Sequence, residues 1–225
     1  MVHAALSFSG SQFRLPARCL PLECLRSASQ VDTRANRILK NITRALFLLS
    51  LCAGSVAAQR SPATGPAQII LIRHGEEPKD NKNPHLSAAG RKRAQDLVSF
   101  ITTDPEMTKL GTPVALYATR TTKHDTGVRT QETLVPLAQS LKLRVQTPFL
   151  GSHYAELAKA VLSNPRYAGK TVLICWNHET IPQLVSALGV TPEPAKWKGK
   201  VFDQVYVISY RKKNPTLQVS RYGAN

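Results

Sequence analysis

The sequence is poor in acidic residues, and this shortage sets its most general property. Asp and Glu together number 14 against 30 Lys and Arg, so the formal net charge is +16 over 225 residues. Such a balance favours partners that carry negative charge, such as nucleic acids, membrane surfaces or anionic small molecules. The basic residues form no long block, and no basic stretch with interleaved aromatic residues occurs. We therefore expect a small anionic substrate and no nucleic-acid partner.

Cysteine is equally scarce, which excludes a disulfide framework for the main part of the chain. Of four cysteines, only Cys175 follows residue 60, and it lies inside an apolar segment typical of a buried strand. Cys19 and Cys24 have no matching second pair, so a zinc site is not indicated. His153 and Glu156 stand three residues apart, but no third ligand accompanies them. The sequence predicts no metal and no cofactor.

No apolar run reaches the length of about 20 residues that a membrane-spanning helix needs. The apolar run 45–53 follows basic residues and is followed by the small residues 54–58. This order is typical of a secretion signal, with cleavage before Gln59. The long stretch that precedes the signal is compatible with a start site assigned too far upstream.

These features predict three parts of the chain. Residues 1–58 form a signal or targeting segment, 59–67 a linker, and 68–225 a catalytic domain without a stable membrane span. The predicted destination is the periplasm or the exterior. A mitochondrial location is the alternative, because the first segment contains Arg and Ser and few acids. Oligomeric state leaves no mark in the sequence.

From residue 68 onward, apolar runs with strand character alternate with stretches of helical periodicity. Predicted strands cover 68–73, 114–119, 143–147 and 171–177, predicted helices cover 87–102, 129–142, 153–163 and 180–188, and 201–210 with 216–221 form a closing hairpin. Repeated alternation of this kind predicts a three-layer α/β/α fold with a mainly parallel sheet and helices on both faces.

The segment Arg73-His74-Gly75-Glu76 directly follows the first predicted strand. Ligands of open α/β sheets bind at the carboxyl ends of such strands. Arg73 offers a planar fork of donors that matches phosphate oxygens, and a neutral His74 is a competent nucleophile. Gly75 lets the backbone turn and lets a bulky anion approach. The arrangement predicts a site that holds and attacks a phosphoryl group.

The same tetrapeptide resembles the signature of the histidine phosphatase superfamily, which includes phosphoglycerate mutases and histidine acid phosphatases. Three further blocks follow in the order of that family: Leu86–Leu97, Arg129–Thr133 and Val172–His178. The resemblance therefore spans residues 68 to about 190. It implies a phosphoglycerate mutase-like fold.

The resemblance also implies roles for individual residues. His74 would take the phosphoryl group as a phosphohistidine, Arg73 and Arg129 would bind its oxygens, and His178 would donate to them. The chain departs from the family pattern at 121–128, which looks like a loop insertion before Arg129. Arg120 is therefore an alternative to Arg129, or a third contact of the phosphate.

A second departure follows His178, where Glu179 replaces the glycine of the mutases. This resembles the acid phosphatases, in which an acid at this point protonates the leaving group. Glu156 and Glu76 are the alternatives for the general acid. The predicted function is a metal-independent phosphatase that hydrolyses a phosphate monoester. A phosphomutase, or a catalytically silent module that binds phosphorylated ligands, is the alternative.

Overall fold

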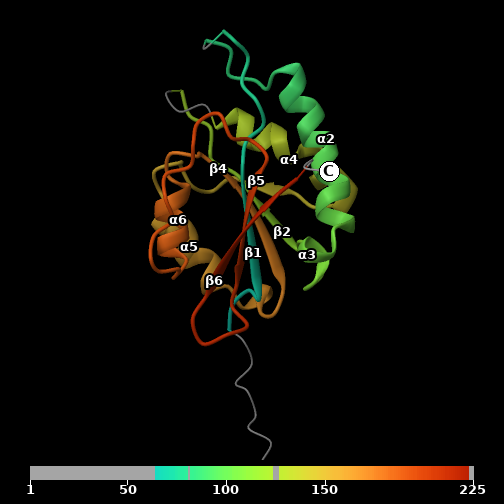
Figure 1. Ribbon diagram of the computed structural model, residues 1–225. Helices are drawn as coiled ribbons and strands as arrows, with labels where there is room; N and C mark the ends of the chain where they lie inside the picture. Colours follow the sequence, from blue (N-terminus) through green and yellow to red (C-terminus); the bar gives the residue numbers. More distant parts are fainter. Residues whose placement is uncertain (1–63, 81, 124–126, 223–225) are drawn as a thin grey trace, which may run out of the picture. The chain divides into compact units, whose positions relative to one another are not determined.

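In the computed structural model, residues 64–80, 82–123 and 127–222 are described, and the predicted signal segment lies outside them. A six-stranded sheet forms the centre of this part of the chain (Figure 1). Its strands are β1 (Gln68–Arg73), β2 (Ala115–Tyr117), β3 (Val145–Gln146), β4 (Thr171–Trp176), β5 (Gln204–Ser209) and β6 (Thr216–Arg221). Their order across the sheet is β3-β2-β4-β1-β5-β6.

Strand β1 lies in the middle of the sheet and determines where the site forms. It pairs in parallel with β4, and Arg73 lies opposite Trp176 in this register. Because both strands end at the same edge, the residues that follow them, His74 and Asn177, emerge side by side. The pairs β2–β3 and β2–β4 are also parallel, whereas β5 and β6 form an antiparallel hairpin beside β1.

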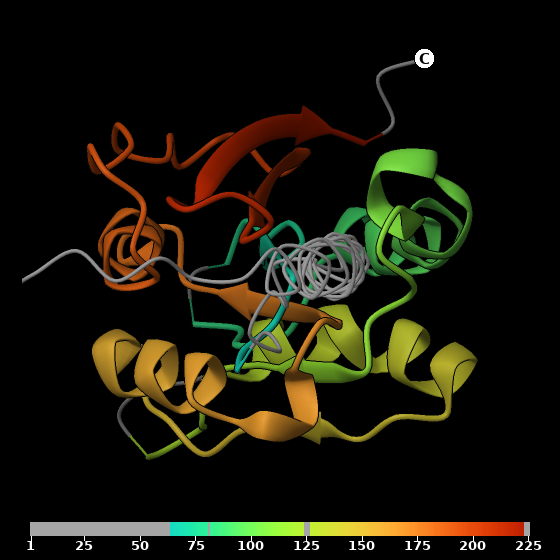
Figure 2. The same cartoon turned by 90° about the horizontal axis from the view of Figure 1, so that it is seen from below.

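Helices cover both faces of the sheet, as the alternation of the sequence predicts. They are α2 (Ala88–Thr103), α3 (Pro105–Thr108), α4 (Val128–Leu141), α5 (Tyr154–Leu162) and α6 (Ile181–Ala187), with a 3₁₀ turn at Pro165–Tyr167. Figures 1 and 2 show α2, α3 and α4 on one side of the sheet and α5 and α6 on the other. The predicted three-layer α/β/α fold with a mainly parallel sheet is confirmed.

Alternate residues of β1 serve two separate cores. Ile69 and Leu71 are fully buried in a cluster with the apolar residues of α5 and α6. Ile70 and Ile72 face the other way, into a cluster with those of α2 and α4. Successive side chains of a strand point to opposite faces, so a strand between two helical layers must be apolar throughout. The unbroken apolar run of β1 therefore reflects burial on both faces.

Capping residues that can be recognised in the sequence mark several helix ends. Ser87 caps α2, because its hydroxyl oxygen accepts a hydrogen bond from the backbone N–H of Gly90 at 3.0 Å. Gly189, with φ +93°, ends α6 in the left-handed region. The short helix α3 was not predicted; Asp104 caps it by accepting from two backbone N–H groups. Among the described residues, no helix is long and apolar enough to cross a membrane.

Candidate active site

A cavity of about 190 Å³ opens where β1 and β4 end. Its lining residues are His74, Glu77, Arg129, Thr130, Asn177, His178 and Glu179. Four residues singled out from the sequence, His74, Arg129, His178 and Glu179, therefore meet around one small space. They come from three separate segments of the chain, which the sheet topology brings together.

A larger hollow of about 790 Å³ lies at the opposite, amino end of β1. It is lined by residues such as Gly65, Leu162 and Tyr210, and its lining includes no histidine and no carboxylate. Size alone would favour this hollow, but the chemistry favours the smaller cavity. Arg211 and Lys213 of the larger hollow could bind an anion, but of the two cavities only the smaller one adds histidines, which could attack or donate to it.

His74 is held in one tautomer by its own neighbour. The side chain is only 7% exposed, and its Nδ1 lies 2.8 Å from the carbonyl oxygen of Gly75. A carbonyl can only accept, so Nδ1 carries the proton and Nε2 keeps a free lone pair. Burial, reinforced by the charge of Arg73, lowers the pKa of His74 to about 4. At neutral pH the imidazole is thus uncharged and nucleophilic at Nε2.

Arg73 is buried beside this imidazole, with 3% of its surface exposed. One guanidinium nitrogen donates to the backbone oxygen of Gly199, and the other donates to Glu77 at 3.1 Å. The guanidinium carbon lies 4.0 Å from the centre of the Phe202 ring, a cation–π contact. Burial lowers the pKa of Arg73, although the carboxylate of Glu77 opposes this effect. The side chain is fixed from three directions before any ligand binds.

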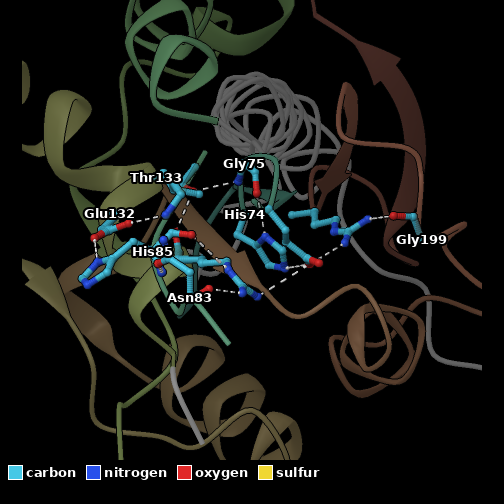
Figure 3. A network of polar contacts seen from close by, with 11 residues as sticks. His74, Gly75, Asn83, His85, Glu132, Thr133 and Gly199 are labelled. Carbon is cyan, nitrogen blue, oxygen red and sulfur yellow. Dashed lines mark hydrogen bonds and ion pairs between the residues drawn. The ribbon is translucent and has the colours of Figure 1, made fainter. Parts of the chain in front are cut away.

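Gly75 allows the chain after β1 to pass directly against α2. A Cβ atom at Gly75 would lie 2.8 Å from the backbone oxygen of Gly90, and one at Gly90 would lie 2.5 Å from that of Glu76. Figure 3 shows the backbone N–H of Gly75 directed at Thr133, whose hydroxyl accepts it at 2.8 Å. The Thr133 hydroxyl in turn donates to the carbonyl oxygen of Arg129 at 2.7 Å. One hydroxyl thus ties the His74 segment to α4.

Arg129, at the start of α4, reaches the cavity, and Arg120 does not line it. The Arg129 guanidinium donates to the carbonyl oxygens of Asn83 at 2.8 Å and His85 at 3.3 Å. Glu132 holds the same loop from the next turn of α4, with His85 at 2.5 Å (Figure 3). Arg120 is exposed, and its backbone N–H bonds to Phe149. The geometry therefore favours Arg129 as the second arginine.

His178 and Glu179 follow β4 and lie on the cavity wall. Burial, followed by the charge of Arg73, lowers the pKa of His178, so its neutral form is favoured. Glu179 is exposed at the rim. The other predicted candidates for the general acid lie elsewhere: Glu156 is exposed on α5, and Glu76 is paired with Arg93 at 2.7 Å. Of these three carboxylates, only Glu179 lines the cavity.

Glu77 is the residue at the centre of the site that sequence reasoning missed. Its Oε1 atom lies 3.1 Å from Arg73 Nη2, 3.5 Å from His74 Nε2 and 3.8 Å from Arg129 Nη1. One anionic oxygen thus sits where the predicted nucleophile and both predicted phosphate-binding arginines converge. Glu77 follows Arg73 by four residues, a spacing that brings side chains together on a helix. Residues 74–80 form neither helix nor strand, so this spacing alone does not predict the contact.

Gly199 and Phe202 were missed as well, although both contact Arg73. Gly199 lies in the loop at 191–200, whose sequence carries no periodic pattern. Phe202 lies in the predicted strand 201–210, but that prediction was wrong at its start, because β5 begins only at Gln204. Among the described residues, no group of three or more His, Cys, Asp and Glu side chains could hold a metal ion.

No protein-family model matches the sequence, and no curated protein matches it. Similar solved structures include a protein described as an alpha-ribazole-5'-P phosphatase from Escherichia coli K-12. It is 17% identical, with a TM-score of 0.48 over 68% of this chain and 96% of that one. A protein described as the phosphohistidine phosphatase SixA from Agrobacterium tumefaciens is 14% identical, with a TM-score of 0.46 over 70% and 99%.

A mycobacterial glucosyl-3-phosphoglycerate phosphatase, solved with inorganic phosphate, is also similar. It is 14% identical, with a TM-score of 0.48 over 71% of this chain and 98% of that chain. At identities of 14–17%, these similarities do not establish the function of this chain, which must be inferred from its own residues.

Proposed function

We propose that this protein is a phosphatase of the histidine phosphatase type, which hydrolyses a phosphate monoester through a phosphohistidine on His74. The observation that carries the proposal is the convergence of Arg73, His74 and Arg129 on a single anionic oxygen. A bound phosphoryl oxygen needs the same three neighbours: two guanidinium donors and a nucleophile within reach.

In the first step, Nε2 of His74 attacks phosphorus while the bond from phosphorus to the leaving oxygen breaks. The Nδ1 proton stays on the ring, held by the carbonyl of Gly75, so the phosphorylated imidazole is a cation stabilised by that hydrogen bond. Arg73 and Arg129 bind the equatorial oxygens, over which charge is spread in the transition state. The neutral ring of His178 carries one N–H group, which donates a hydrogen bond to the same oxygens.

The departing alkoxide needs a proton, and Glu179 is the proposed donor because it lies at the rim of the cavity. In the second step the same carboxylate takes a proton from water, whose oxygen attacks the phosphohistidine. The bond between Nε2 and phosphorus breaks, and inorganic phosphate leaves with the enzyme restored. Two easier displacements thus replace one hard displacement.

Turnover of p-nitrophenyl phosphate by the full-length protein, with and without EDTA, tests the proposal. We expect turnover that EDTA leaves unchanged, and acid-labile phosphate on His74 in rapidly quenched samples. His74→Ala should abolish both, whereas His153→Ala, outside the cavity, should retain them. If His74→Ala keeps turnover within about tenfold of the wild type, covalent catalysis by this residue is excluded.

The same assay separates the two alternatives. Binding of phosphate esters without any turnover would indicate the silent binding module. Transfer of the phosphoryl group between two phosphoglycerates, in preference to water, would indicate the phosphomutase.

A further inference from the structure

The carboxylate of Glu77 occupies the position that a phosphoryl group would need. Its Oε1 atom contacts Arg73, His74 and Arg129 at 3.1, 3.5 and 3.8 Å. A phosphoryl oxygen bound by both arginines in front of His74 Nε2 would have to take the same place. Glu77 and a substrate therefore exclude each other.

The side chain is able to leave. Glu77 is 37% exposed, whereas Arg73 and His74 are almost fully buried. It belongs to a segment without helix or strand, directly after the His74 turn. Rotation about its side-chain bonds moves the carboxylate toward solvent and leaves both guanidinium groups in place, because Gly199 and Phe202 hold Arg73, and Asn83 and His85 hold Arg129.

The balance of charge favours this exchange. With His74 neutral, the two arginines provide two positive charges, and Glu77, the cavity carboxylate that contacts them, offsets one; Glu179, the other carboxylate of the cavity, lies exposed at the rim. A phosphate dianion offsets both, and its several oxygens accept from both guanidinium groups at once. A carboxylate is thus a strong enough ligand to fill the free site and a weaker one than the phosphoryl group that displaces it.

We propose that Glu77 is an internal competitor of phosphate, which fills the phosphoryl position in the free enzyme and returns to it as the product leaves. This inference rests on the proposed function, and it adds to the site a residue that sets how tightly phosphate and substrates bind. The competitor weakens the binding of every anion by the fraction of time for which the position is open. If the carboxylate is in place about nine tenths of the time, apparent affinity falls about tenfold.

A second role for Glu77 gives the opposite result. If the carboxylate served to hold Arg73 and Arg129 in position, its removal would loosen the arginines and weaken phosphate binding. The direction of the change therefore decides between competition and positioning.

Titration calorimetry with inorganic phosphate on the full-length protein provides the test, because it does not depend on turnover. Glu77→Gln should bind phosphate about tenfold more tightly than the wild type, and the inhibition constant of phosphate during ester hydrolysis should fall by the same factor. Glu77→Asp keeps the charge but is one methylene shorter, so it should resemble the Gln variant. Glu156→Gln removes the same charge from the exposed surface of α5, outside the cavity, and should change phosphate binding less than about threefold.

The other outcomes overturn the inference in distinguishable ways. If the wild type binds phosphate and hydrolyses esters, but Glu77→Gln binds phosphate equally or more weakly, the competitor role is wrong and the proposed function stands. If Glu77→Asp binds phosphate as the wild type does, the tighter binding of Glu77→Gln comes from the lost negative charge and not from the lost contact with the arginines. If neither the wild type nor the Gln variant binds phosphate, the anion site itself is refuted, and the proposed function with it.

Discussion

Two arginines near each other in the sequence differ sharply in their surroundings. The Arg129 side chain is 19% exposed and points at the oxygen shared with His74, whereas Arg120 is exposed outside the cavity. A charge-assisted contact to a transition-state oxygen is worth on the order of 2–4 kcal/mol. The position of Arg129 at the start of α4, and not its closeness to Arg120 in the sequence, places its side chain in the cavity.

Replacement of Arg129 by Ala should lower kcat/KM by about 30-fold to about 1000-fold, which follows from that contact energy. Arg120→Ala is the matched control and should stay close to the wild type. Arg129→Lys keeps the charge but loses the second donor of the fork, so it should recover only part of the loss. Steady-state kinetics of the three variants measure these changes in kcat/KM. A larger loss for Arg120→Ala than for Arg129→Ala would mean that Arg120 is the second arginine that binds the phosphoryl group.

The general acid can be identified by varying the leaving group. A nitrophenolate leaves without a proton, whereas an alkyl alcohol needs one. Glu179→Gln should therefore depress hydrolysis of an alkyl phosphate strongly and that of p-nitrophenyl phosphate only mildly. Glu156→Gln, exposed on α5 and outside the cavity, should affect neither substrate. Equal losses on both substrates would instead show that Glu179 orients His178.

Sequence reasoning reached the residues of the site that occupy the ends of regular elements. Arg73 ends a buried strand, His74 and His178 come just after buried strands, and Arg129 lies in the first turn of a helix. The strand pattern pointed to Arg73 and His74, and the resemblance to the motif blocks of a known family pointed to Arg129 and His178. Glu77, Gly199 and Phe202 lie in irregular segments. Their contacts depend on how residues 74–80 and 191–203 lie over the edge of the sheet, which no local pattern in the sequence encodes.

At the scale of elements, the junction between β1 and α2 is built on two glycines. Gly90 lies in the first turn of α2, where its backbone touches that of Gly75 and Glu76. Helix propensity alone predicts that Ala at position 90 stabilises the protein by about 0.5–1 kcal/mol. Packing predicts that Ala at position 90 destabilises the protein, because its Cβ would lie 2.5 Å from the backbone oxygen of Glu76. A backbone atom cannot rotate away from the clash as the end of a side chain can.

We expect packing to win, so that Gly90→Ala lowers the free energy of unfolding by about 1–3 kcal/mol, as overpacking does. Turnover should fall too, because the displaced backbone carries His74. Ser99→Ala lies on the exposed face of the same helix and should stay within about 0.5 kcal/mol of the wild type. Urea denaturation followed by circular dichroism measures both; a stabilised Gly90→Ala would refute the close contact.

At the scale of the whole molecule, the site joins distant parts of the chain. Arg73 donates to Gly199, which is 126 residues away in sequence, and Gly75 bonds to Thr133, which is 58 away. Only the folded sheet, with β1 and β4 adjacent, holds these groups together. Burial of a neutral His74 in this assembly makes the stability of the protein depend on pH.

The sign of that dependence follows from the lowered pKa of His74, about 4 in the folded protein against 6.5 for an exposed histidine. Between these values the unfolded chain binds a proton that the folded protein does not, so acid favours unfolding. The contribution of His74 to stability is fully present above about pH 6.5 and is lost as the pH falls toward 4. His178 shifts in the same direction.

Linkage gives a loss of about 2 kcal/mol from His74 between pH 7.5 and pH 5. Urea denaturation at the two pH values should show that the wild type loses about this much more stability than His74→Asn, which has no group that titrates in this range. An NMR titration of the folded wild type should place the His74 imidazole near pH 4. If the variant and the wild type lose stability in parallel, His74 is not buried in its neutral form, and the nucleophile proposed at Nε2 would have to compete with a proton at physiological pH.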